Sequence, residues 1–511
     1  MHNRGGEFQK RRLVLGILVF TCLVGTFLKC PACFAGCSIL YSFDSFANDG
    51  INPYGSLTPS GSTFYGVAEQ GGAWGYGTIF QINANGSGYQ VLYDFGGVTG
   101  DGANPFGALT LSGFTLYGMT SGGGVNGQGV IFKINTDGSG YRVLHCFAGA
   151  PTDGANPYGS LIISGSMLYG MTRRGGGAVA WGGGYANTGA IFRINTDGSG
   201  YEVLYNFGSV GNDGAGPYGS LALVGSTLYG MTAGGGNYQK GVIFRVNMDG
   251  SGYGVLYDFG GSRSNGANPY GVLTFSGATL YGMTNGGGLY GLGTIFQINT
   301  DGSGYGVLHS FGSAANDGAY PLGPITASGA TLYGMTPSGG SGNFGAIFQI
   351  NTDGTGYQLL YSFVNACCGN NSAYPLGPLA VSGSNLCGTT VAGGAHGQGA
   401  VFSLAVSPAS GLWQGATELG GGWMWLDWFG YFNLNNSPWI NHLTLGWLYP
   451  YGTSTGSIWF WDPVMRSFWW TNQSIYPYLF RQSDGAWLFY EEGASNPRWF
   501  YNFKTGLWER D

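Results

Sequence analysis

A tandem repeat of about fifty residues dominates the sequence and restricts the folds open to it. Each copy contains a proline followed by an aromatic residue or leucine, and then by glycine. These prolines are Pro53, Pro105, Pro157, Pro217, Pro269, Pro321 and Pro375, so their spacings are 52, 52, 60, 52, 52 and 54 residues. A period of this length indicates a solenoid or a propeller, in which each unit completes its core against its neighbours.

Each unit predicts four short strands. In the third unit they cover residues 158–163, 167–172, 190–194 and 203–207, where β-branched and aromatic residues alternate with polar ones. The turn before the last strand, Asn195-Thr196-Asp197-Gly198, is a β-hairpin signal because the Asp-Gly pair supplies positive φ angles. We therefore expect one four-stranded antiparallel sheet per unit.

The strand motifs start and stop out of phase with the units. The motif of the fourth strand occurs seven times, but the hairpin that should precede it occurs six times. The extra copy, residues 39–43, lies before the first unit, whereas the last unit stops at its third strand, residues 400–404. This arrangement predicts an all-β fold in which residues 38–405 form a seven-bladed, kelch-like β-propeller closed by the N-terminal strand.

The units also carry a family resemblance. The recurring Leu-Tyr-Gly-Met-Thr, Gly-Gly-Gly, Ile-Phe-x-Ile-Asn and Asp-Gly-Ser-Gly-Tyr motifs resemble the GloVer (Gloeo/Verruco) tandem repeat of exported bacterial proteins. The resemblance implies an extracellular protein and brings no biochemical activity with it.

The first 35 residues have the features of a signal peptide. Basic residues precede an apolar run at 13–28, and cleavage is expected after Ala35. A second interpretation is a lipoprotein signal, because Phe34-Ala35-Gly36-Cys37 resembles a lipobox and would place a lipid on Cys37. Since an apolar run of about 16 residues is short of the roughly 20 that span a bilayer, we expect no transmembrane span after signal removal. The protein is then secreted or held at the cell surface.

The composition changes after residue 405. Residues 406–412 form a short linker, and residues 413–511 hold all but two of the 15 tryptophans. Alternating aromatic and turn residues predict a small Trp/Gly-rich module of β-hairpins. It is similar to Trp/Gly-rich modules of choline- and glucan-binding proteins and to C-terminal domains of verrucomicrobial surface proteins. Its tryptophans either contact a glycan or the cell envelope, or build the core that a small module needs.

Candidate binding residues lie on the loops whose length varies between units, because varied loops on a rigid scaffold often carry function. The set consists of Arg173, Arg174, Trp181 and Tyr185 in the third unit, with Trp74, Tyr238, Lys240, Tyr290 and His396 in others. Aromatic rings with a few polar groups suit the C–H faces of sugars. The alternative is that these rings only cover the ends of the sheets.

The sequence supports no catalytic, metal or cofactor site. An acidic column, Asp49, Asp101, Asp153, Asp213 and Asp317, could bind calcium, but one carboxylate per loop fits an Asx-turn better. His145 and His309 replace a repeat tyrosine and are expected to be structural. Pairing among Cys146, Cys367, Cys368 and Cys387 stays open, with Cys387 expected to bond Cys367 or Cys368.

These features together predict an exported, monomeric and non-enzymatic protein. Its loop face would bind a glycan or protein, and its C-terminal module would associate with the envelope. The net charge of −6 without a basic stripe argues against nucleic acid. Two alternatives remain: a carbohydrate-active hydrolase or lyase on the same scaffold, and a purely structural repeat protein.

Overall fold

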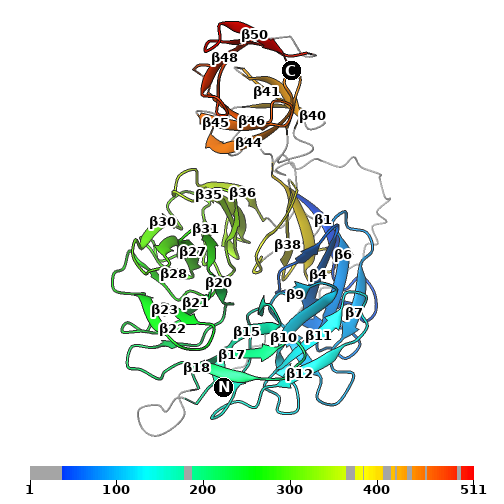
Figure 1. Ribbon diagram of the computed structural model, residues 1–511. Helices are drawn as coiled ribbons and strands as arrows, with labels where there is room; N and C mark the ends of the chain where they lie inside the picture. Colours follow the sequence, from blue (N-terminus) through cyan, green and yellow to red (C-terminus); the bar gives the residue numbers. More distant parts are fainter. Residues whose placement is uncertain are drawn as a thin grey trace, which may run out of the picture. The chain divides into compact units, whose positions relative to one another are not determined.

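A computed structural model of the 511-residue chain provides the structure. It describes residues 37–177, 187–363, 374–383, 385–406, 416–420, 423–427, 429–433, 440–454, 457–472, 474–491 and 497–510. The predicted signal peptide, most of the predicted linker and the candidate residues Trp181 and Tyr185 lie outside this part. The described residues form strands and turns and contain no helix, so the fold is all-β (Figure 1).

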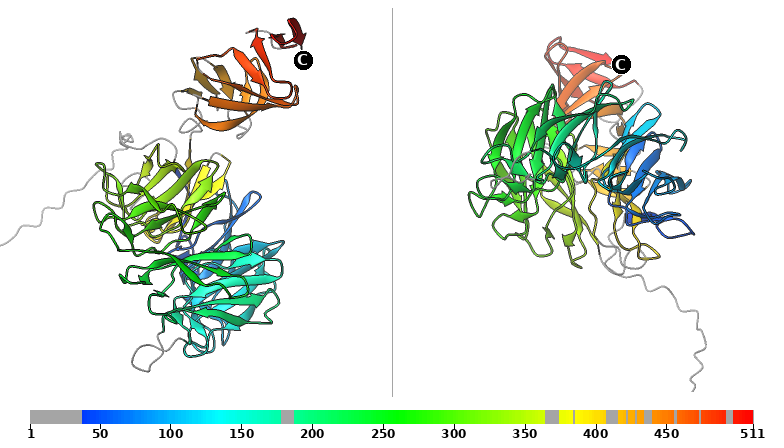
Figure 2. Two further views of the ribbon diagram at one scale, coloured as in Figure 1. Left: turned by 60° about the vertical axis from the view of Figure 1, so that its left-hand side comes forward. Right: turned by 90° about the horizontal axis from the view of Figure 1, so that it is seen from below.

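The repeat domain contains seven antiparallel sheets of four main strands each, which lie side by side around a common centre (Figures 1 and 2). The first strands are β3 (Thr58–Ser60), β9 (Thr110–Ser112), β14 (Ile162–Ser164), β20 (Ala222–Val224), β26 (Thr274–Ser276), β32 (Thr326–Ser328) and β37 (Ala380–Ser382). The second strands are β4 (Thr63–Ala68), β10 (Thr115–Gly123), β15 (Met167–Thr172), β21 (Thr227–Thr232), β27 (Thr279–Thr284), β33 (Thr331–Thr336) and β38 (Asn385–Thr390). The third strands are β6 (Thr78–Asn83), β11 (Val130–Asn135), β17 (Ala190–Asn195), β23 (Val242–Asn247), β29 (Thr294–Asn299), β35 (Ala346–Asn351) and β39 (Ala400–Ala405). The fourth strands are β7 (Gln90–Asp94), β12 (Arg142–Cys146), β18 (Glu202–Asn206), β24 (Gly254–Asp258), β30 (Gly306–Ser310), β36 (Gln358–Ser362) and β1 (Cys37–Ser42).

Short ribbons extend the sheets on the side of the long loops. They pair β2 (Gly50–Ile51) with β5 (Gln70–Gly71), β8 (Gly102–Pro105) with the end of β10, β13 (Gly154–Ala155) with β16 (Arg174–Gly175), β19 (Gly214–Ala215) with β22 (Gly234–Gly235), β25 (Gly266–Ala267) with β28 (Gly286–Gly287), and β31 (Gly318–Ala319) with β34 (Ser338–Gly339). These ribbons fix the base of each loop, and the sequence did not predict them.

The first strand of each sheet is shorter than the sequence predicts. In the third unit the expected strand at 158–163 reduces to β14, which begins at Ile162. The residues before it do not pair with β15. The amide of Ser160 instead donates to the hydroxyl of Ser220 in the next unit, at 2.6 Å. These residues therefore bond to the neighbouring sheet and not to their own.

The N-terminal strand belongs to the last sheet. Strand β1 pairs antiparallel with β39, placing Ile39 opposite Phe402 and Ser42 opposite Ala400. The sheet reads β1-β39-β38-β37, so a segment before the first unit supplies the fourth strand of the last. This is the pairing that the phase of the strand motifs predicts.

The core consists of apolar layers between neighbouring sheets. Most positions of the second and third strands are buried, because both faces of a sheet pack against neighbours. One layer joins the first sheet to the last through Phe43, Leu57, Phe80 and Val401. Five units place a methionine at the same position of the second strand, and these side chains are buried in the layers, where a flexible side chain fills irregular gaps: Met119, Met171, Met231, Met283 and Met335.

Each loop carboxylate joins two sheets. Asp101 accepts hydrogen bonds from the hydroxyl of Tyr93 in one sheet, at 2.9 Å, and from that of Tyr141 in the next, at 2.6 Å. The two rings stack with centroids 3.7 Å apart. Asp101 also accepts from the amides of Gly96 and Gly102. We call this arrangement the Asp clamp; it recurs at Asp49, Asp153, Asp213 and Asp317.

The Asp clamp corrects one expectation and confirms another. An Asx-turn bonds the amide two residues ahead, whereas the clamp carboxylates bond the next amide and amides four or five residues back. The acids therefore hold neighbouring sheets together as well as the loop. His145 and His309 take the tyrosine place and donate to Asp153 and Asp317, a structural role as predicted.

The expected disulfide of Cys387 is not present. Its thiol is free and buried in the layer between the last and first sheets, where it contacts the hydroxyl of Ser403 at 3.7 Å. The position faces this layer because Cys387 lies on the buried second strand, opposite Ala380. Cys367 and Cys368 lie outside the described residues.

The C-terminal module is a separate sheet of eleven strands in chain order. These are β40 (Thr417–Gly420), β41 (Trp423–Leu426), β42 (Gly430–Asn433), β43 (Ile440–His442), β44 (Gly446–Ser454), β45 (Ser457–Asp462), β46 (Ser467–Thr471), β47 (Tyr478–Arg481), β48 (Ala486–Tyr490), β49 (Trp499–Asn502) and β50 (Leu507–Arg510). The sheet curls around one core that includes Phe432, Leu448 and Trp469. A buried ion pair between Arg498 and Asp462, at 2.7 Å, joins segments far apart in the sheet.

Within the part of the chain that the structure describes, no helix has the length and apolarity needed to cross a membrane.

Candidate functional site

A narrow cavity of about 100 Å³ lies where the seven units meet. Equivalent three-residue segments of all seven units line it, each placed just after the repeat proline. The glycines of these segments allow the units to approach closely. A Cβ atom on Gly159 would lie 2.3 Å from the carbonyl oxygen of Gly219, and one on Gly377 would lie 3.0 Å from that of Gly55. The contacts therefore run from unit to unit, and from the last unit to the first.

Aromatic rings surround the mouth of this cavity. Five of the seven units place an aromatic side chain immediately before the glycine: Tyr54, Phe106, Tyr158, Tyr218 and Tyr270. Each ring contacts the next, with centroid distances of 4.6, 5.0, 5.5 and 4.9 Å in that order. Leu322 and Leu376 occupy the same place in the remaining units. We call this set of five rings the collar.

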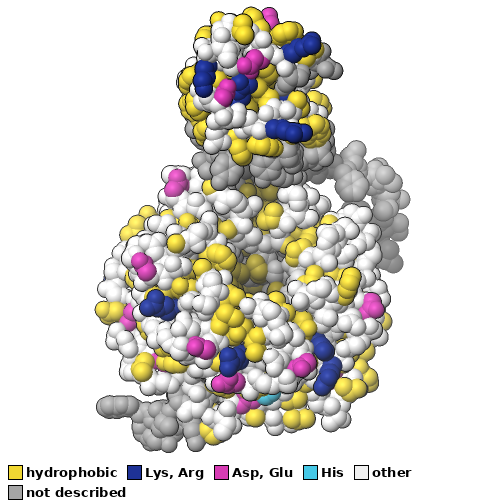
Figure 3. Space-filling model, in the orientation of Figure 1, with side chains coloured by type: hydrophobic (Ala, Val, Ile, Leu, Met, Phe, Trp, Pro, Cys, Tyr) yellow, Lys and Arg dark blue, Asp and Glu magenta, His cyan; other side chains and the backbone are white. Residues whose placement is uncertain are grey.

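Hydrophobic side chains gather around the hollow of the repeat domain, with a few charged groups among them (Figure 3). One charge at the collar is Arg173, whose guanidinium lies over the rings of Tyr218 and Tyr158, with Cζ 4.4 and 5.6 Å from their centroids. A cation over an aromatic face is attracted by the negative charge of the ring face. Arg173 is thus held at the collar by the rings of two units.

In the first unit, Glu69 occupies the repeat position that Arg173 occupies in the third. Burial raises the pKa of Glu69, and the charge of Glu69 adds to burial in raising the pKa of Tyr54. Both Glu69 and Arg173 follow the second strand of their units, and their amides donate to the carbonyls of Asn52 and Asn156. The other units carry Ser121, Ala233, Asn285, Pro337 and Val391 at this position.

The predicted loop residues occupy a second zone. Trp74, Tyr238 and Tyr290 are each more than half exposed. Each lies beside a glycine in the loop that follows the fourth strand of its own sheet: Gly97, Gly261 and Gly312. Lys240 lies beside Gly260, and Arg174 and His396 are exposed. These residues come from five different units and lie at separate places around the loop face. Of the predicted binding residues that the structure describes, Arg173 alone lies at the collar.

Sequence reasoning missed the collar. The residue between proline and glycine was assigned to a strand, where an aromatic side chain has no functional meaning. Its signal was nevertheless in the repeat, because an aromatic residue recurs at this one position in five of seven units. Because the units meet at one point, aromatic residues at equivalent positions of five consecutive units form a row of contacting rings.

The collar offers binding chemistry of a specific kind. The rings give apolar faces, the tyrosine hydroxyls give hydrogen bonds, and Arg173 and Glu69 give one positive and one acidic group. Within the described residues, no three Asp, Glu, His or Cys side chains are grouped so as to hold a metal ion. The arrangement can stack on a flat apolar surface and bond polar groups at its edge.

Fold and collar together define an all-β protein of tandem four-stranded sheets with an aromatic site where the units meet. The Gloeobacter/Verrucomicrobia repeat matches residues 24–222 and 177–402. The chain therefore belongs to this repeat family, as its motifs predicted. No curated protein matches the chain.

Many solved structures are similar at low sequence identity. The GH74 enzyme of Niastella koreensis is 13% identical, with a TM-score of 0.48, over 92% of this chain and 73% of that one. An oligogalacturonate lyase from Vibrio parahaemolyticus is 11% identical, with a TM-score of 0.44, over 73% of this chain and 94% of that one. A structure described as a nidogen/laminin complex is 15% identical, with a TM-score of 0.35, over 57% and 90%.

Proposed function

We propose that the protein is an exported glycan-binding protein whose seven sheets form a closed, seven-bladed propeller. The binding site is the collar together with Arg173, Glu69 and the exposed rings of the loop face. The observation that carries the proposal is the row of five contacting rings with Arg173 over two of them. Sugars present C–H faces that pack on such rings and hydroxyls that bond to charged and polar groups.

Support for the closed ring comes from three independent contacts between the first and last units. The N-terminal strand β1 pairs with β39, Phe80 of the first sheet and Val401 of the last share one apolar layer, and Gly377 approaches Gly55. The threonine hydroxyl of Thr389 also donates to the carbonyl of Gly55 at 3.0 Å. A rigid ring of this kind holds the collar residues in fixed positions, which lowers the entropy cost of binding.

A carbohydrate-active hydrolase or lyase on this scaffold is the rival proposal. Glycoside hydrolysis uses two carboxyl groups across the scissile bond. At the collar position of Glu69 the other six units carry no acid, so the sequence offers one carboxylate there. The binding proposal uses Glu69 as a hydrogen-bonding group and does not require a second acid.

Export and attachment complete the proposal. The signal at residues 1–35 directs the chain out of the cytoplasm. Outside the cytoplasm the chain acts as a secreted or surface protein. The C-terminal module associates with the envelope. The protein acts as a monomer. The remaining alternative is a purely structural repeat protein, which would bind no ligand.

A glycan array probed with the chain from residue 37 onward tests the proposal. The unaltered protein is expected to bind a set of glycans, and Arg173→Ala is expected to weaken that binding about tenfold or more. Arg263→Ala is the matched control, because Arg263 is an exposed loop arginine outside the collar. Release of new reducing or unsaturated ends from a bound polysaccharide would establish the enzyme instead. If Arg173→Ala binds glycans as tightly as the unaltered protein, the collar is not part of the binding site.

A further inference from the structure

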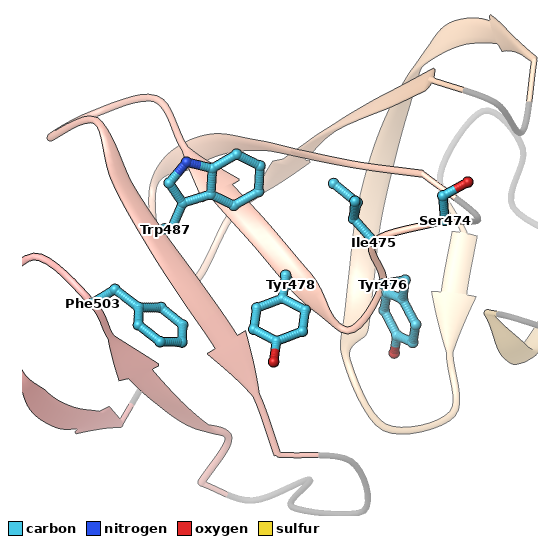
Figure 4. A pocket seen from close by; sticks show the side chains of 6 residues that line it. All are labelled: Ser474, Ile475, Tyr476, Tyr478, Trp487 and Phe503. Carbon is cyan, nitrogen blue, oxygen red and sulfur yellow. The ribbon is translucent and has the colours of Figure 1, made fainter.

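The C-terminal module has an aromatic cavity that the site above does not use. Its volume is about 440 Å³, and Ser474, Ile475, Tyr476, Tyr478, Trp487 and Phe503 line it. This volume lies within the range of roughly 300–1,000 Å³ that is typical of small-molecule sites. The rings of Phe503, Tyr478 and Tyr476 lie in a row, with Trp487 and Ile475 on the opposite side (Figure 4).

Neighbouring rings hold this cavity in shape. Trp487 contacts Phe480 and Trp470, with centroids 5.5 and 6.2 Å away. Tyr478 contacts Phe489 and Phe503, with centroids 5.3 and 5.9 Å away. The lining rings nevertheless stay open to solvent, with Tyr478 43%, Trp487 41% and Phe503 53% exposed. Aromatic faces that are fixed and yet exposed are prepared for a ligand.

The row of rings continues beyond the cavity on the outward side of the sheet. Cross-strand pairs place Trp459 opposite Trp470, Trp470 opposite Phe480, and Phe480 opposite Trp487. Strands β45 to β48 therefore each contribute an aromatic residue to one line that leads into the cavity. A line of this kind fits an extended chain of rings better than a compact ligand.

The charges around the cavity favour a neutral ligand. None of the six lining residues is charged, and their polar groups are hydroxyls and the indole N–H. Arg481, at the end of the strand that carries Tyr478, is paired with both Asp484 and Glu509, at 2.8 Å each. A quaternary ammonium would seek rings closing around it with an acid nearby, whereas this cavity has rings in an open row.

We propose that the Tyr476–Tyr478–Trp487–Phe503 cavity is a binding site for a neutral polysaccharide, whose sugar rings pack on these side chains and continue along the aromatic line. The site refines the envelope association proposed for this module and is independent of the collar. Loss of binding at either site leaves the other measurable.

Native gel electrophoresis in gels containing a neutral polysaccharide tests the site on the chain from residue 37 onward. Hydroxyethylcellulose and glucomannan are the neutral probes, polygalacturonate is the acidic probe, and choline chloride is tested by calorimetry. The protein is expected to be retarded by at least one neutral probe. Trp487→Ala and Phe503→Ala are each expected to weaken that binding by about tenfold, or about 1.4 kcal/mol.

Trp425→Ala provides the matched control, because Trp425 is 38% exposed on the same sheet but does not line the cavity. It is expected to bind within about twofold of the unaltered chain. Trp487→Tyr keeps an aromatic face, is expected to retain binding, and gives a result if Trp487→Ala fails to fold. Three results would each overturn the proposal: no retardation of the unaltered chain by either neutral probe, retardation of Trp487→Ala and Phe503→Ala as strong as that of the unaltered chain, or binding of choline or polygalacturonate alone. Arg173→Ala is expected to leave this retardation unchanged.

Discussion

The hydroxyl of Tyr141 donates a 2.6 Å hydrogen bond to the carboxylate of Asp101, which lies in the loop that joins the sheet of Tyr93 to the sheet of Tyr141. The same carboxylate accepts from Tyr93 and two amides, so all four bonds converge on one side chain. The fifth unit breaks this pattern, because Asn265 takes the place of the acid. There the buried hydroxyl of Tyr305 has no hydrogen-bond partner.

Restoring the acid in the fifth unit is expected to stabilise the repeat domain. Asn265→Asp provides an acceptor for Tyr305 and should raise the free energy of unfolding by about 1–2 kcal/mol. Asp101→Asn is the reverse change and should lower it by a similar amount. Urea unfolding measures both. Asp137→Asn, in an exposed hairpin, is the control, with an expected effect within about 0.5 kcal/mol. If Asn265→Asp destabilises the chain, the Asp clamp is not a general device of the fold.

A covalent cross-link tests the pairing of the first strand with the last sheet. Ser42 lies directly opposite Ala400 in the β1–β39 ladder. The double variant Ser42→Cys with Ala400→Cys is expected to form a disulfide on mild oxidation, detected by mass spectrometry of the linked peptides. The control pairs Ser42→Cys with Ala346→Cys, since Ala346 holds the equivalent place in the preceding sheet, opposite Ser362. The closed ring would be contradicted if Ser42→Cys with Ala400→Cys formed no disulfide, or if the control pair formed one.

The glycine in the middle of the second strand should tolerate no side chain. A Cβ atom on Gly118 would lie 2.4 Å from Cζ of Phe132 and 2.9 Å from Leu109. Gly118→Ala is therefore expected to lower the free energy of unfolding by about 1–3 kcal/mol, because the core must move to make room. Gly211→Ala is the control, since nothing lies within 4 Å of its added Cβ. Equal thermal stability of the two variants would show that the layer around Phe132 is loosely packed.

The C-terminal module is expected to lose stability in weak acid. Burial lowers the pKa of His442 from the usual 6.5 to about 4, even though the Phe429 carbonyl beside it acts in the opposite direction. The unfolded chain therefore binds a proton more readily than the folded one. Stability is complete above pH 6.5 and falls as the pH drops toward 4, by roughly 3 kcal/mol in all.

Tryptophan fluorescence measures this loss in the whole chain, because all tryptophans except Trp74 and Trp181 lie in the C-terminal module. His442→Gln is expected to flatten the dependence on pH between 4 and 6.5. His396→Gln, at an exposed position of the repeat domain, should leave the dependence as it is. If the stability of His442→Gln still falls between pH 6.5 and 4, another titratable group causes the loss.

Local patterns predicted most of the strands. Apolar alternation and the Asp-Gly hairpin located β15, β17 and β18 to within about a residue, because each depends on neighbours in the chain. The phase of the motifs also predicted that the segment from Ile39 would pair with that of Phe402. These features follow from periodicity and turn chemistry, which a single sequence contains.

Contacts between units were harder to predict. The tyrosine of the Asp-Gly-Ser-Gly-Tyr motif lies between the predicted hairpin turn and the predicted fourth strand, where the sequence indicates no partner for it. Its hydroxyl bonds an acid some 40 residues away, as in Tyr141 and Asp101. The collar was missed for the same reason, since Tyr54 and Phe106 meet only after two units pack together. Side chains that act between repeats have no signature within one repeat. Their regular recurrence is the only sign of them in the sequence.

The ladder between β1 and β39 also sets the order of assembly. Ile39 and Phe402 are paired in this ladder although almost the whole repeat domain separates them in the sequence. Strand β1 is therefore synthesised first among the described strands but cannot pair until β39 has been made. Until residue 402 has been made, β1 has no partner strand and the last sheet lacks its fourth strand. For the exported chain proposed above, this delay favours crossing the membrane before the fold is complete, because the partner of β1 is synthesised last.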